Sequence, residues 1–187
     1  MKKFILIFFL ASVFTAGLTS CLKEKAGEVN DEELITTMQL AFTPVAGGQT
    51  VTYLFDDPDG PGGVAPIQDV IKLNAGTAYN VQITLLNNST VPPEDITEEV
   101  IEEAIAHRFY FEPDSNAGIT VSNQDTDING VPLGVNSTWT TAAAGNGTIK
   151  ITLRHFGASP PDKEVSDPVN SAKSSSDIEL VFVTNLL

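Results

Sequence analysis

Apolar and polar residues alternate along most of the chain after about residue 33, and this period of two is the feature that most restricts its fold. Every second residue of a strand lies on the same face, so the alternation predicts strands that are buried on one side. Seven runs show the pattern: 34–42, 51–55, 79–85, 107–111, 119–121, 149–153 and 178–182. Breaks rich in Gly, Asn, Asp and Pro separate these runs and predict turns.

Seven to nine short strands joined by turns are typical of an antiparallel β-sandwich of the immunoglobulin-like type. Residues 34–187 are enough for one domain of this kind with its own core. Residues 95–106 depart from the alternation, because their apolar residues recur at helical spacing behind an acidic first turn. We therefore predict one short amphipathic helix, which crosses between the sheets or covers one end of the sandwich.

The first 21 residues have the layout of an export signal. Two lysines at positions 2 and 3 precede an apolar run over 4–16, and small residues follow. The sequence Leu18-Thr19-Ser20-Cys21 resembles the lipobox of bacterial lipoproteins. That resemblance implies cleavage before Cys21 and a diacylglycerol on its sulfur. We expect a signal peptide over 1–20, a lipidated Cys21 with a polar tether over 21–33, and the domain over 34–187.

The chain is strongly acidic, with 24 Asp and Glu against 10 Lys and Arg and a net charge of −14. Removal of Lys2 and Lys3 with the signal peptide takes this charge to −16. Such a surface repels nucleic acid and anionic lipid headgroups, so nucleic acid is excluded as a partner. The lipid would hold the protein at a membrane. We expect an outer-membrane lipoprotein of the cell envelope, and the sequence does not fix which side it faces.

The two histidines lie at opposite ends of predicted strands. His107 begins the run with Phe109 and Phe111, whereas His155 ends the run with Ile151 and Leu153. If these strands were antiparallel neighbours, both imidazoles would lie at one edge of the sandwich, where they could ligate a haem iron or a divalent transition metal.

Glu103 lies four residues before His107 and could add a third ligand if the helix extends that far. The alternative is that each histidine donates to a carbonyl or carboxylate and ties a strand end to a loop. The sequence leaves both interpretations open, because it does not fix the strand pairing.

A weaker candidate for calcium binding lies at Asp125, Asp127 and Asn129, which alternate as at the start of an EF-hand loop. The closing acidic ligand would fall at Asn136, so the motif is incomplete. A type I′ hairpin turn at Asn129-Gly130 explains the same residues, and we favour it.

The remaining motifs do not predict catalysis. The chain has no Gly-x-Ser-x-Gly elbow, phosphate-binding loop or dinucleotide fingerprint, so we predict that it is not an enzyme. Residues 157–177 are rich in Pro and Ser and predict a long loop directly after His155. Long loops are functional or mobile, and both interpretations stay open.

Several blocks resemble a group of uncharacterised Bacteroidota lipoproteins: 31–37, 53–60, 94–99, 148–155 and 176–182. Members carry a periplasmic-binding-type label and are encoded beside TonB-dependent outer-membrane receptors. The label implies a larger α/β fold, whereas the alternation predicts a β fold. The neighbouring receptors imply a non-enzymatic binding or accessory protein that captures haem, a metal or a small ligand. The alternative is a structural or adhesive surface module with no small-molecule ligand.

Overall fold

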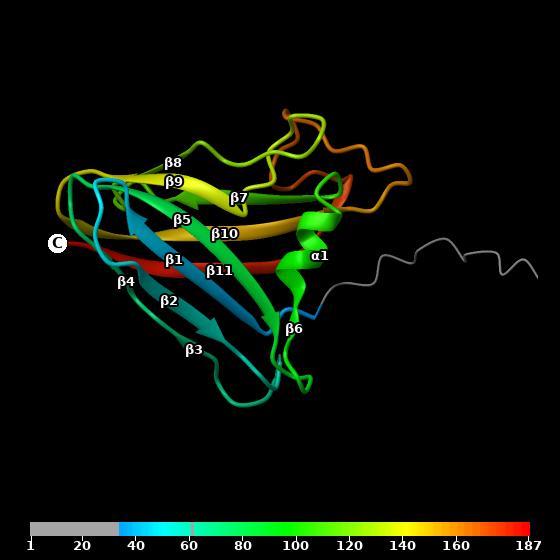
Figure 1. The fold of residues 1–187 in the computed structure, drawn as a ribbon, viewed down its shortest axis with the longest axis horizontal. Coiled ribbons are helices and arrows are strands. Elements are labelled where there is room, and N and C mark those ends of the chain that lie inside the picture. The colour runs from blue at the N-terminus through cyan, green and yellow to red at the C-terminus, as the bar shows by residue number, and fades with distance from the viewer. Residues whose placement is uncertain (1–33, 61) are drawn as a thin grey trace, which may run out of the picture.

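The computed structural model describes residues 34–60 and 62–187, which form two β-sheets and one short helix (Figure 1). The larger sheet contains β1 (Thr37–Pro44), β2 (Val51–Asp56), β3 (Ile67–Gln68), β5 (Ala78–Asn87), β6 (Glu94–Asp95), β8 (Ile119–Ser122) and β9 (Asn136–Thr141). The smaller sheet contains β4 (Ile71–Leu73), β7 (His107–Pro113), β10 (Gly145–Phe156) and β11 (Ser174–Leu186). The predicted signal peptide, Cys21 and tether lie outside the described residues.

The strand order is β3-β2-β1-β5-β9-β8 in the larger sheet, where β6 also pairs with β5, and β4-β11-β10-β7 in the smaller sheet. All pairs are antiparallel except β4 with β11, which is parallel. The two sheets share one apolar core, to which β1 contributes Phe42 and β10 contributes Ile151. The ring of Trp139 packs edge-on against Phe42 at 5.2 Å and against Phe111 at 5.7 Å. These contacts bury apolar surface from both sheets, which is the main stabilising term in such a fold.

The structure confirms a mainly β fold, and each of the seven predicted runs contains a strand. The described residues hold eleven strands, so the predicted count of seven to nine was too low. Three of the additional strands, β3, β4 and β6, have only two or three residues. The fourth is β9, which buries Ser137, Trp139 and Thr141 on its inner face although only one of them is strongly apolar. The α/β fold implied by the family label is not the fold of the described residues.

The predicted helix is present as α1 (Ile96–Glu102) and links β6 of the larger sheet to β7 of the smaller one. The Asp95 carboxylate accepts a hydrogen bond from the Thr97 N–H at 2.9 Å and caps the first turn. Ile96 and Val100 are buried, whereas Glu98 and Glu99 are exposed. The helix ends four residues before the predicted Ala106, and turns over 103–106 lead into β7. Within the described residues, no helix has the length and hydrophobicity needed to cross a membrane.

Candidate metal site

The two histidines lie directly opposite each other in the smaller sheet. β7 and β10 are antiparallel neighbours, and His107 pairs with His155 in the register between them. The pairing left open by the sequence is therefore the one that brings the imidazoles together at the end of the sheet. Their ring centroids are 4.5 Å apart, and the ring planes are inclined by 34°.

Glu103 joins the histidine pair although α1 ends at Glu102. The turn after the helix keeps Glu103 beside the start of β7, and Nδ1 of His107 lies 3.2 Å from the backbone oxygen of Glu103. One potential ligand atom from each of Glu103, His107 and His155 lies within 4.8 Å of the others. The structure thus gathers all three residues that the sequence nominated for a metal or haem.

The hydrogen bond at Nδ1 sets the protonation state of that ring nitrogen. A carbonyl oxygen can only accept, so Nδ1 of His107 must carry the proton that it shares with Glu103. In a neutral imidazole the other nitrogen, Nε2, then holds the lone pair that could bind a cation. The three side chains differ in exposure: Glu103 is exposed, His155 is half-buried and His107 is fully buried.

Sequence reasoning missed Asp177, whose carboxylate lies beside His107. Its Oδ2 lies 3.8 Å from Nε2 of His107, and both side chains are fully buried. Asp177 sits at a β-bulge, because Leu153 pairs with Ile178 whereas Arg154 pairs with Ser176. The available signal was an acidic residue directly before the apolar alternation that begins at Ile178, but the alternation does not reveal the bulge.

Lys163 is a second residue that the sequence did not reveal. Its ammonium donates to the backbone oxygens of Ala104 at 2.6 Å, His107 at 2.8 Å and Pro132 at 3.2 Å. It also forms an ion pair with Asp127 at 3.0 Å, and both side chains are 1% exposed. Burial lowers the pKa of Lys163, and the neighbouring Asp127 carboxylate opposes that shift. Lys163 fixes the backbone at the start of β7, from which His107 projects.

The calcium candidates use their carboxylates within the protein. Asp127 accepts from the N–H groups of Asn129 at 2.8 Å and Val131 at 2.9 Å, and Lys163 contacts its other oxygen. Burial raises the pKa of Asp127, but the hydrogen bonds from Lys163 and the backbone outweigh it and leave the pKa below its usual value. Asp125 accepts from Gly134 and Asn136. The Lys163 ammonium therefore balances the charge of Asp127, and the geometry does not favour calcium at these residues.

The turn at this position differs in type from the one that the sequence favoured. Gly130 donates to the carbonyl of Asp127 at 3.0 Å, and Asp127 donates to that of Val131 at 2.9 Å. Gly130 has a φ of 78°, whereas Asn129 is not in the left-handed region. A type I′ turn at Asn129-Gly130 requires positive φ at both residues, so that assignment was wrong. The geometry is that of a three-residue loop with glycine as the left-handed residue.

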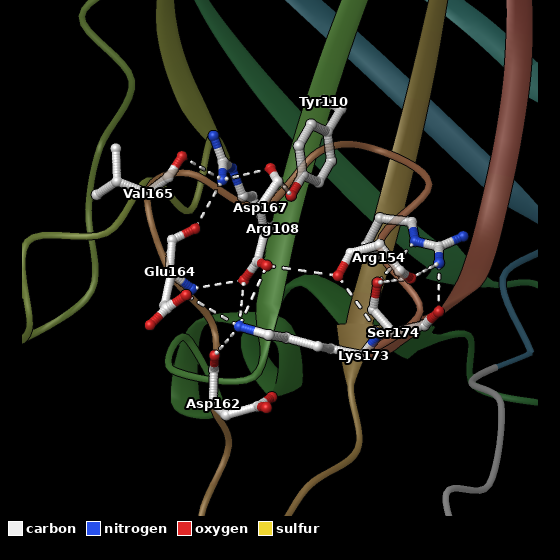
Figure 2. Close-up of polar contacts among 10 residues, drawn as sticks. Arg108, Tyr110, Arg154, Asp162, Glu164, Val165, Asp167, Lys173 and Ser174 are labelled. Carbon is white, nitrogen blue, oxygen red and sulfur yellow. Dashed lines mark hydrogen bonds and ion pairs between the residues drawn. The ribbon is translucent and has the colours of Figure 1, made fainter.

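The residues next to the histidines, Arg108 and Arg154, are also paired in register and project from the other face of the sheet. Figure 2 shows how they hold the long loop after β10. Arg108 donates to the backbone oxygens of Glu164, Val165 and Asp167 at 3.1 to 3.3 Å. Arg154 donates to the hydroxyl of Ser174 at 3.0 Å. These hydrogen bonds tie the loop to the smaller sheet beside the candidate site. The loop predicted over 157–177 is shorter in the structure, because its last four residues belong to β11.

A cavity of about 550 Å³ lies on the outward face of the larger sheet and does not involve the histidines. Its lining includes Thr43, Asn80, Gln82 and Thr138, and none of its lining residues has an ionisable side chain. The cavity therefore lacks strong metal ligands. The potential metal ligands gather instead at the end of the smaller sheet.

No protein-family model, curated protein or solved structure matches the chain. Its function is therefore inferred from the geometry of the site.

Proposed function

We propose that the protein is a lipid-anchored, non-enzymatic envelope protein that binds a transition-metal ion through Glu103, His107 and His155. The observation that carries this proposal is the convergence of three potential ligand atoms within 4.8 Å, from residues 52 positions apart at the extremes. Two imidazoles and a carboxylate form a donor set that suits zinc and its neighbours in the first transition row. Metal–ligand bonds of about 2.0–2.2 Å require a modest contraction of this cluster. The exposed side chain of Glu103 can supply that movement.

A bare ion fits this geometry better than haem. Two axial histidines bind a haem iron from opposite faces of the porphyrin. His107 and His155 instead lie side by side on one face of a sheet, with centroids 4.5 Å apart. That arrangement leaves no space for a porphyrin between them, whereas a single ion can contact both rings from one side.

The cellular role rests on the sequence alone. The lipobox-like sequence before Cys21 supports an anchor in the outer membrane, and the family resemblance supports a partnership with a TonB-dependent receptor. In this role the protein would capture an ion at the envelope and pass it to the receptor. The finer assignment of an immunoglobulin-like sandwich also remains a proposal, supported by two sheets around one core.

The metal proposal is tested by isothermal titration of the purified full chain with Zn2+, Co2+, Ni2+ and haem. We expect stoichiometric binding of a metal ion. His155→Ala should weaken it at least about a hundredfold, and Glu103→Gln about tenfold. Glu102→Gln is the matched control, because it removes the same charge from the neighbouring exposed position and should bind as the wild type does. A wild-type chain that takes up no metal ion would refute the proposal.

The anchor has a separate test. Cys21→Ser should move the protein from the membrane fraction to the soluble fraction of the envelope, because the lipid and not charge holds it there. If the variant stays with the membrane fraction, the anchor at Cys21 is not what retains the protein.

The alternative function is a structural or adhesive surface module. The buried contact between His107 and Asp177, at 3.8 Å, favours this alternative, because a protonated histidine there would form an ion pair that ties β7 to β11. Under this alternative, the variant lacking both histidines loses stability without losing any ligand.

Copurification from the native envelope also separates the accessory role from the surface module. Recovery of a TonB-dependent receptor supports the accessory role, whereas self-association or matrix binding supports the surface module.

A further inference from the structure

Asp177 is directed into the candidate site by an irregularity of the smaller sheet. The register between β10 and β11 shifts after Leu153, so Asp177 is the additional residue of a β-bulge. Bulges change the direction of a side chain and are frequent beside functional sites. Here the carboxylate is fully buried next to a fully buried imidazole.

The spacing between Asp177 and His107 fits two ligands of one ion. The 3.8 Å between Oδ2 and Nε2 exceeds a hydrogen bond. It matches two ligands that each lie about 2.0–2.2 Å from a shared cation at a wide angle. Nε2 is the nitrogen that faces Asp177, and Nδ1 is already engaged with the backbone oxygen of Glu103. A cation on the Asp177 side of the ring would therefore leave that hydrogen bond intact.

We propose that Asp177 is a further ligand of the metal site and that the site takes a divalent first-row cation such as Zn2+. This inference rests on the proposed function. Two carboxylates, Glu103 and Asp177, balance the charge of a divalent ion held by two neutral imidazoles. Copper(I) prefers thiolates and thioethers, and this donor set has neither. Glu103 is exposed and the Asp177 side chain is fully buried, so in this proposal Glu103 is the ligand nearer to solvent and Asp177 the one farther from it.

The test compares Zn2+ affinity of the full chain with that of Asp177→Asn, which keeps the size of the side chain and removes its charge. We expect the dissociation constant to rise at least about tenfold, as for loss of a group that ligates or directly supports the metal. Glu179→Gln is the control, since it removes one charge from an exposed position two residues along β11 and should leave the affinity unchanged. Equal affinity of wild type and Asp177→Asn overturns the role of Asp177 and leaves the proposed function standing. A wild type that binds no Zn2+ overturns both.

A second measurement needs no variant and so does not depend on whether Asp177→Asn folds. Long-range 1H–15N NMR spectra of the Zn2+-loaded full chain identify which nitrogen of His107 carries the ion. We expect the ion on Nε2, with Nδ1 still protonated. Coordination through Nδ1 would put the ion on the side of the ring away from Asp177 and would overturn the inference.

Discussion

Lys163 joins four parts of the chain through a single ammonium group. Its three backbone acceptors lie in the turn after α1, at the start of β7 and in the loop before β9, and Asp127 supplies the charge. A buried ion pair of this kind contributes little net stability, but removal of one partner leaves the other charge buried and uncompensated. The main effect of removing Lys163 would therefore be to destabilise the backbone around His107.

We expect Lys163→Met to lower the free energy of unfolding by about 3–5 kcal/mol, because the Asp127 carboxylate then loses its buried counter-charge. Urea unfolding followed by circular dichroism measures the change. Lys173→Met is the control: this lysine pairs with Glu164 and Asp167, and about a third of its side chain is exposed. Its loss should cost less than about 1 kcal/mol. Equal effects of the two substitutions would contradict a special role for Lys163.

The low pKa of Asp127 predicts how stability depends on acid. The unfolded chain, with an Asp pKa of about 3.9, binds a proton at higher pH than the folded chain does. The stabilisation from this carboxylate is therefore complete above about pH 4 and is lost as the pH falls toward the folded-state pKa. Asp127→Asn should make the acid side of the profile shallower in urea unfolding between pH 5 and 2. An acid side as steep in Asp127→Asn as in the wild type would contradict the assignment.

At the scale of elements, α1 connects the larger sheet to the candidate site. Asp95 begins the helix on the larger sheet, and the turn at its other end presents Glu103 beside His107. The helix has only seven residues, so its stability depends on its cap and on the buried Ile96 and Val100 rather than on helix propensity.

Asp95→Ala should lower the free energy of unfolding by about 0.5–2 kcal/mol, because the N–H of Thr97 loses its acceptor. Asp95→Asn retains a good capping side chain and should stay within a few tenths of a kcal/mol of the wild type. Urea unfolding of both variants measures the difference. If Asp95→Asn is as unstable as Asp95→Ala, the effect comes from the charge of Asp95 and not from the cap.

The strongest elements were predictable from the sequence because their residues alternate over a long run. β1, β5 and β10 bury Phe42, Ile83 and Ile151 on one side, and the period of two identifies them directly. β9 was missed because its inward residues include Ser137 and Thr141, which are buried by their neighbours rather than by their own hydrophobicity. Tertiary context decides such strands, so no local pattern reveals them.

The sequence predicts the part of the candidate site that depends only on the positions of residues at strand ends. His107 begins one strand and His155 ends another, so antiparallel pairing was enough to bring them together. Asp177 and Lys163 could not be found in the same way. The position of Asp177 depends on a bulge, and that of Lys163 depends on how a long loop folds back on the sheet. Both are properties of the assembled fold.

For the whole molecule, the proposed site links ion binding to the unfolding equilibrium. Free Zn2+ at a hundred times the dissociation constant should add about 2.7 kcal/mol to the stability of the folded state. For a chain of this size that corresponds to a rise in Tm of about 5–10 °C. Differential scanning calorimetry with Zn2+ and with EDTA measures it. His155→Ala should lose the shift, and an unchanged shift in that variant would place the ion on the acidic surface instead.

The β-bulge at Asp177 has a consequence for how the protein matures. Glu103, His107, His155 and Asp177 come from three distant parts of the sequence, and only the closed smaller sheet assembles them. A nascent or cleaved chain in which β11 has not paired with β10 presents only some of the proposed ligands, so we expect it to bind an ion more weakly than the complete sheet does. Under the proposed function, the fraction of molecules that hold metal would then equal the fraction that have completed folding. A loss of metal early in unfolding would show that β11 detaches before the rest of the two-sheet fold.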